Sequence, residues 1–134
     1  MSTPAISKPV PIQDFVAELK KFPEPAFSRI DQIIRFLQHT PVLPDTLAPY
    51  LTWDKQHYTR NLIDKTPLYE LVAICWEIGQ SSSIHNPREF NQRAVSLHVY
   101  SRPFDTCVVY SQEQGTCGVI KLHYQTEYGK PAKN

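Results

Sequence analysis

The chain has 134 residues, of which 41% are hydrophobic and 20% are charged, and its formal net charge is +1. This length suits one small domain, and the composition excludes a wholly disordered chain. The net charge gives no electrostatic reason to expect nucleic acid or an anionic membrane as a partner. No apolar run approaches the ~20 residues that span a bilayer, and three widely spaced cysteines match neither a disulfide framework nor a zinc CxxC pair. We therefore expect a soluble, cytoplasmic protein.

The N-terminal third predicts an extended arm followed by helices. Residues 1–11 contain three prolines and predict the arm. Residues 12–22 and 27–38 carry apolar side chains at helical spacing, and Asp45 is expected to cap a third short helix that ends near Leu51. The helices either cover a sheet or bind a partner through their apolar stripe, and a core alone is enough to explain the stripe.

The remainder of the chain predicts short strands. Residues 69–76 form an almost continuous apolar run, which indicates a strand buried on both faces. Residues 94–101 alternate between apolar and polar side chains, as a strand with two different faces does. Further strands are predicted at residues 57–63, 106–111 and 117–124. We thus expect a single domain, 1–134, that is mainly β with N-terminal α-helices: an arm (1–11), a helical cap (12–51) and a β region (53–128).

Tyr58 and Arg60 are the first candidate binding residues. They alternate along a predicted strand, so their side chains point to the same side. A guanidinium that projects into the mouth of a barrel needs an anion, and a carboxylate bound through two hydrogen bonds is the commonest fit. The alternative is an exposed arginine on an edge strand.

Ser96, His98 and Tyr100 share one face of a predicted strand, where their polar ends can form a hydrogen-bonded row. Such a row either lines a cavity or meets solvent. His85 follows a serine-rich loop and is a candidate metal ligand, although a lone histidine is more often structural. Cys75 lies in an apolar strand, where cysteine usually acts as a small hydrophobic residue.

Several stretches, taken in order, resemble the cysteine dioxygenase family. They are residues 58–62 (YTRNL), 75–76 (CW), 82–85 (SSIH) and 96–107 (SLHVYSRPFDTC). The resemblance runs from about residue 58 to the C-terminus, and the motifs are specific only in combination. It implies a cupin barrel with mononuclear non-haem Fe(II), which adds both atoms of O₂ to the sulfur of L-cysteine and gives cysteine sulfinate in cysteine metabolism.

The resemblance also implies a role for each matching residue. Arg60 would bind the carboxylate of the substrate, with Tyr58 beside it. His85 matches the first iron-binding histidine. The remaining matches form the trio that places a tyrosine hydroxyl next to the substrate and O₂: Ser96, His98 and Tyr100.

The sequence departs from the family after His85. The family pattern continues as His-x-His, but the second position here is Pro87, which has no donor atom. The later strand with the third histidine is absent, so we interpret the chain as a family member with an internal deletion near residues 86–87, of ~50 residues at typical strand spacing. The predicted fold is accordingly an incomplete, mostly antiparallel cupin-type sheet, whose exposed edges favour self-association.

This departure predicts lost or impaired oxidation of cysteine, because Fe(II) in this chemistry needs three protein ligands on one side. An active enzyme would have to hold iron through His85 and substitute ligands such as His57, His98 or His123, which their spacing does not favour. The alternative is a non-catalytic remnant, or defective gene product, with at most a weak amino-acid site at Arg60.

Overall fold

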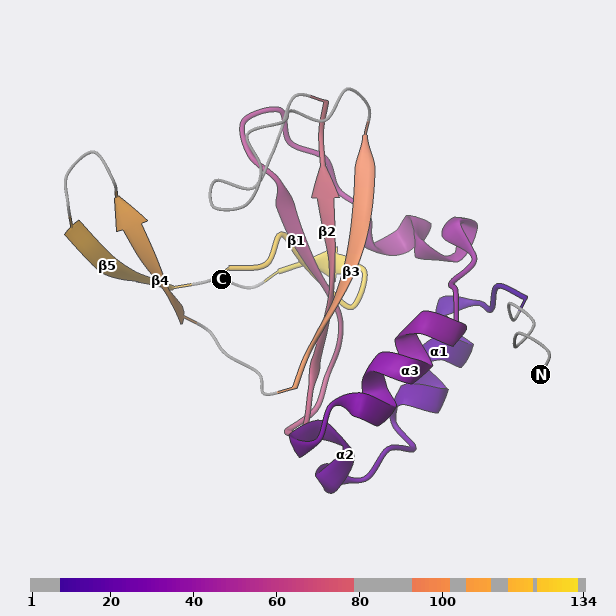
Figure 1. Ribbon diagram of the computed structural model, residues 1–134. Helices are drawn as coiled ribbons and strands as arrows, with labels where there is room; N and C mark the ends of the chain where they lie inside the picture. The colour runs from indigo at the N-terminus through magenta and orange to yellow at the C-terminus, as the bar shows by residue number, and fades with distance from the viewer. Residues whose placement is uncertain (1–7, 79–92, 102–105, 112–115, 122, 133–134) are drawn as a thin grey trace.

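The computed structural model describes residues 8–78, 93–101, 106–111, 116–121 and 123–132, with the backbone alone for 106–111 and 116–121. Four helical segments come first, in the part predicted as a helical cap (Figure 1). They are α1 (Ile12–Leu19), α2 (Glu24–Ser28), α3 (Asp31–His39) and the 3₁₀-helix η1 (Pro44–Tyr50). Asp45 lies in the first turn of η1 without capping it, contrary to our prediction.

The helix predicted over residues 27–38 is broken. Arg29 leaves the helical conformation (φ −115°, ψ 93°), so the predicted stripe is divided between α2 and α3. Phe27 and Ile33 are buried in the core, whereas Ile30 and Ile34 are 50% and 41% exposed. The stripe therefore does not face the sheet as one unit.

The strands form an open sheet and a separate hairpin (Figure 1). The five-stranded sheet has the order β3-β2-β1-β6-β7, in which β1 and β6 are parallel and the other pairs are antiparallel. Its strands are β1 (Thr59–Lys65), β2 (Glu70–Trp76), β3 (Ala94–Tyr100), β6 (Thr126–Glu127) and β7 (Lys130–Pro131). The hairpin pairs β4 (Thr106–Ser111) with β5 (Thr116–Lys121). The predicted incomplete, mostly antiparallel cupin-type sheet is confirmed.

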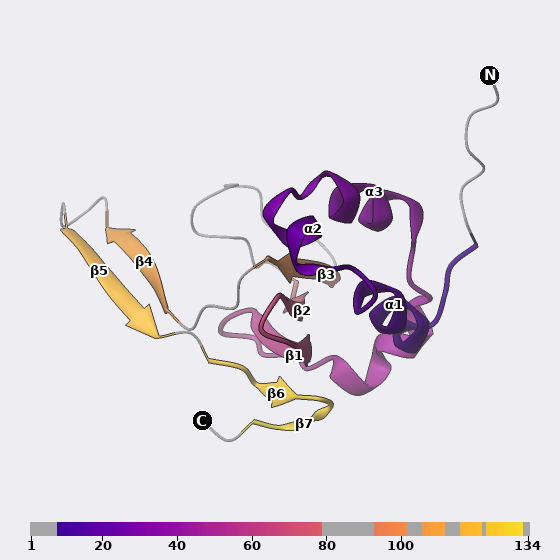
Figure 2. The same cartoon turned by 90° about the horizontal axis from the view of Figure 1, so that it is seen from below.

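The helices cover one face of the sheet (Figure 2). On that face Leu71 and Ala73 of β2 are fully buried in one apolar cluster with Phe15 of α1 and Phe27 of α2. The rings of Phe27 and Tyr69 stack with their centroids 5.7 Å apart. Burial of these apolar groups holds the helices on the sheet, and it leaves the opposite face for the polar side chains.

Val10, in the predicted arm, is hydrogen-bonded to the loop after α3, since its amide donates to the Pro41 carbonyl at 2.9 Å. In the described part of the chain, no helix combines the length and apolar character needed to cross a membrane. Self-association through strand edges stays a prediction; the described sheet ends in β3 on one side and β7 on the other.

Candidate functional site

The register of the three central strands brings the polar candidates to the face away from the helices. Across β2 and β3, Ile74 lies opposite Ser96, Val72 opposite His98, and Glu70 opposite Tyr100. Arg60 of β1 lies opposite Ile74. Since these residues alternate with the helix-facing ones, Ser96, His98 and Tyr100 share one face, as their spacing predicted, and strand pairing adds Arg60 to the same face.

Arg60 is almost completely buried, at 7% exposure, and is held by an ion pair. Its Nη2 donates to Glu70 Oε1 at 3.2 Å, and its Nη1 donates to the His123 carbonyl at 3.4 Å. The guanidinium carbon lies 5.0 Å from the centroid of the Tyr124 ring, within cation–π range. The alternative of an exposed edge-strand arginine is therefore wrong.

Glu70 completes this pair and has no exposed surface. The Tyr124 hydroxyl donates to its Oε1 at 2.6 Å, so that one oxygen receives both partners. The second oxygen, Oε2, is buried without a hydrogen-bond partner among the described residues. Burial, followed by the hydrogen bond to Glu70, raises the pKa of the Tyr124 phenol, which keeps it a donor at neutral pH.

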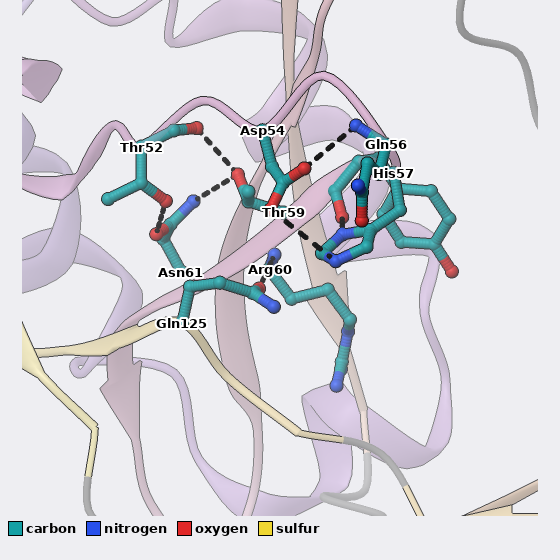
Figure 3. A network of polar contacts seen from close by, with 9 residues as sticks. Thr52, Asp54, Gln56, His57, Thr59, Arg60, Asn61 and Gln125 are labelled. Carbon is teal, nitrogen blue, oxygen red and sulfur yellow. Dashed lines mark hydrogen bonds and ion pairs between the residues drawn. The ribbon is translucent and has the colours of Figure 1, made fainter.

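The backbone of β1 is fixed by a second polar network, which Figure 3 shows around Thr59 and Asn61. Buried Asn61 accepts hydrogen bonds from Thr52 at 2.7 Å and from Thr126 at 2.8 Å. The Arg60 amide donates to Gln125 Oε1 at 2.6 Å. In Figure 3 the Arg60 side chain extends away from Asn61, so the same strand that anchors β6 presents the guanidinium on its other face.

The predicted polar row on β3 is partly a hydrogen-bonded chain. Ser96 Oγ lies 2.7 Å from His98 Nε2 and accepts a hydrogen bond from Trp76 Nε1 at 3.0 Å. The rings of His98 and Tyr100 are stacked, 6.0 Å apart and 16° from parallel. Serine and tryptophan thus fix the position of the imidazole beside the phenol.

Burial sets the protonation state of the two ring groups on β3. It lowers the pKa of the His98 imidazole, and the positive charge of Arg60 lowers it further. It also raises the pKa of the Tyr100 phenol, although Arg60 opposes this shift. Both rings are consequently neutral near pH 7.

Tyr58 lies beside this group at its edge and is 39% exposed. Its ring contacts Trp76, with the centroids 4.9 Å apart. His57, a conceivable substitute ligand, is exposed and pairs with Asp54 at 3.6 Å. His123, another, is exposed and contributes its carbonyl oxygen to Arg60.

The predicted iron ligand His85 and the junction at residues 86–87 lie outside the described residues. The flanking segments are joined by Glu77 and Arg93, whose carboxylate and Nε lie 2.8 Å apart. The hydrogen bond from Arg93 lowers the pKa of the Glu77 carboxyl. Within the described ranges, no three His, Cys, Asp or Glu side chains come together as a possible metal site.

Two residues of this face, Glu70 and Tyr124, were not singled out from the sequence, and Trp76 was noted only as part of the CW motif at 75–76. Glu70 had a usable signal, because it is the charged residue of the run 69–76 that we predicted to be buried on both faces. A charge in such a strand must find a partner. Tyr124 gave no comparable signal, since its contact with Glu70 joins residues 54 positions apart in the chain.

Comparison with known proteins shows that this chain is similar to cysteine dioxygenases. A family model described as cysteine dioxygenase type I matches residues 1–91, about two thirds of the 134 residues. Cysteine dioxygenase type 1 of Danio rerio is 20% identical over 188 aligned positions, covering 97% of this chain and 94% of the relative. The protein of that name from Homo sapiens is 22% identical over 186 positions, covering 96% of this chain and 93% of the relative.

These alignments are longer than the chain itself. Of the 188 positions aligned with the Danio rerio protein, at least 54 face a gap in this chain, which has 134 residues. Because the model match covers more than half of the chain, it establishes membership in spite of the low identity. The chain therefore belongs to the cysteine dioxygenase type I family.

Proposed function

We propose that this chain binds L-cysteine, or a closely similar amino acid, through its carboxylate at Arg60, and that its oxidation of cysteine is lost or strongly impaired. The observation that carries the first part is the buried guanidinium of Arg60 on the same face as Ser96, His98 and Tyr100. The family match supports L-cysteine and O₂ as the substrates of the ancestral reaction. A cytoplasmic location belongs to the same proposal.

The guanidinium has unused capacity to bind a carboxylate. Arginine offers five N–H donors, and the contacts of the Arg60 side chain with described residues use two of them, toward Glu70 and the His123 carbonyl. The neighbouring Tyr58 and Tyr100 would border the ligand, as the resemblance implies. Burial strengthens charge-assisted hydrogen bonds at such a position, because water competes less there.

The ligand set does not fit the three-histidine iron site that the family resemblance implies. Pro87 stands at the second ligand position, and at least 54 aligned positions have no residue in this chain. Of the conceivable substitutes, His98 has its Nε2 beside Ser96, and His57 pairs with Asp54. We therefore place no reaction step on iron in this chain, and infer that the oxidation is impaired.

Sulfinate formation tests the impairment directly. The purified chain is loaded with Fe(II), mixed with L-cysteine in air, and compared with the same iron solution without protein. We expect no cysteine sulfinate above the iron-only control. Enzymatic turnover would instead favour the alternative, in which His85 and substitute ligands hold iron in an active dioxygenase.

Calorimetric titration with L-cysteine tests the binding site. Arg60→Ala should abolish the binding heat, whereas Arg35→Ala, which removes an exposed arginine of α3, should leave it unchanged. Circular dichroism of each variant shows whether the sheet has folded. Equal heats from the folded wild type and folded Arg60→Ala would exclude an amino-acid site at Arg60.

A further inference from the structure

We propose that Glu70 is the acceptor for the ammonium group of the ligand, so that the site selects zwitterionic amino acids over carboxylates that lack an amino group. This inference rests on the proposed carboxylate site at Arg60 and names the residue that sets its ligand class. Neither the resemblance nor the comparisons assign a role to Glu70.

The first support is the unequal use of the two oxygens of Glu70. Oε1 receives Arg60 Nη2 at 3.2 Å and the Tyr124 hydroxyl at 2.6 Å, whereas Oε2 is buried without a described partner. A carboxylate oxygen that is removed from water without a hydrogen-bond donor destabilises the fold. An ammonium group supplies both the donor and the positive charge that this oxygen lacks.

The second support is the charge balance of the face. Arg60 and Glu70 carry opposite charges 3.2 Å apart, with side chains 8% and 0% exposed. The charges of Arg60 or Glu70 also act on His98, Tyr100 and Tyr124, whose pKa directions favour the neutral forms near pH 7. The buried pair and these three rings together therefore carry no net charge, and Glu127 is a further acidic group that acts on Tyr124.

Because the buried pair carries no net charge, we expect it to favour ligands that are also neutral overall. A carboxylate without an amino group would place a second negative charge near Glu70 and leave the region with an excess of one charge, which is unfavourable at low dielectric. An α-amino acid brings one charge of each sign. Its carboxylate meets Arg60 and its ammonium meets Glu70, so both buried charges gain partners and the balance is preserved.

Tyr124 packs against the Arg60–Glu70 pair. Its ring lies over the guanidinium and its hydroxyl bonds Glu70, so it covers the pair, yet the residue is itself partly exposed. Tyr124 is therefore a partly exposed neighbour of both members of the buried pair.

The test compares two probes in the presence of a metal chelator, so that no metal ion can hold the amino group. The probes are L-cysteine and 3-mercaptopropionate, which is cysteine without its amino group. In the wild type we expect L-cysteine to bind more tightly by about tenfold or more, the range of one charge-assisted hydrogen bond. Glu70→Gln should weaken L-cysteine by a similar factor and strengthen 3-mercaptopropionate, because it leaves Arg60 uncompensated.

Glu18→Gln is the matched control, since Glu18 lies on α1 with an exposed side chain paired to Lys21. It should leave both affinities unchanged. If Glu70→Gln does not fold, the wild-type ratio still decides: equal affinities for the two probes would overturn the inference.

The two proposals fail in different ways. Wild-type binding of L-cysteine that depends on Arg60, with the same preference in folded Glu70→Gln, would overturn the role of Glu70 and leave the Arg60 site standing. No binding of either probe by the folded wild type would overturn both proposals.

Discussion

The two faces of the β1–β2–β3 sheet are stabilised by different kinds of interaction. The face under the helices is apolar, and burial of residues such as Leu71 and Phe15 stabilises it without specific partners. The other face contains a smaller apolar cluster of Leu62, Val72 and Ile74, and its charged groups are buried among neighbours. The stability of the helix-covered face thus depends on the shape and volume of its side chains. The stability of the other face depends on hydrogen bonds and ion pairs between specific atoms.

This contrast explains why the two faces should respond differently to substitution. An apolar face tolerates substitutions of similar volume, whereas removal of one partner of a buried ion pair leaves an uncompensated charge.

Removing one partner of the buried ion pair should have the largest effect on stability. Arg60→Met leaves Glu70 charged and buried without its guanidinium, which typically costs about 3–5 kcal/mol. Urea unfolding followed by circular dichroism measures the change. The double variant Arg60→Met with Glu70→Leu should recover most of the loss, because no buried charge remains. If it were as unstable as the single variant, packing rather than charge would account for the effect.

Truncation on the helix-covered face should cost slightly less. Leu71→Ala removes a fully buried side chain and should lower the free energy of unfolding by about 2–5 kcal/mol. Val95→Ala is the control, because Val95 is 38% exposed on β3 and its truncation should change stability by less than about 1 kcal/mol. Urea midpoints of the two variants, compared with the wild type, check the difference.

The Asn61 network should contribute less than either. Asn61→Ala leaves the hydroxyls of Thr52 and Thr126 without their acceptor, and we expect a loss of about 1–3 kcal/mol. Gln32→Ala, on the exposed side of α3, should be nearly neutral. Hydrogen exchange at the β1–β6 pairing provides a local readout, and unchanged protection there would mean that Asn61 does not anchor β6.

The smallest effect should be a pH dependence that comes from His98. Its pKa in the folded protein lies below the ordinary value of about 6.5, so the unfolded chain binds this proton more readily. Stability should therefore fall as the pH drops from 6.5 toward the folded-state pKa, and this contribution should be absent above about pH 7. The difference between wild type and His98→Gln in urea midpoints across this range isolates it from the other histidines. A His98 NMR titration midpoint above 6.5 would contradict the sign.

Local patterns in the sequence predicted the elements of the sheet well. The apolar run at 69–76 became the buried strand β2, and the alternation at 94–101 became β3 with two different faces. The helical stripe at 27–38 was predicted less well, because the break at Arg29 redirects α3 and exposes Ile30. The spacing of apolar residues predicts which side chains share a face of a regular helix. It does not predict the position at which the chain leaves the helical conformation.

The family resemblance, the polar row on β3 and the predicted lack of a metal ligand at Pro87 could all be inferred from the amino-acid sequence, because each depends on residue identity at fixed spacing along one segment. The partners of Arg60 could not be inferred in this way. Glu70 lies on the neighbouring strand and Tyr124 is more than sixty residues away, and no local pattern links them. Strand pairing brings their charges within hydrogen-bond distance, and burial then makes the partner of each charge decisive.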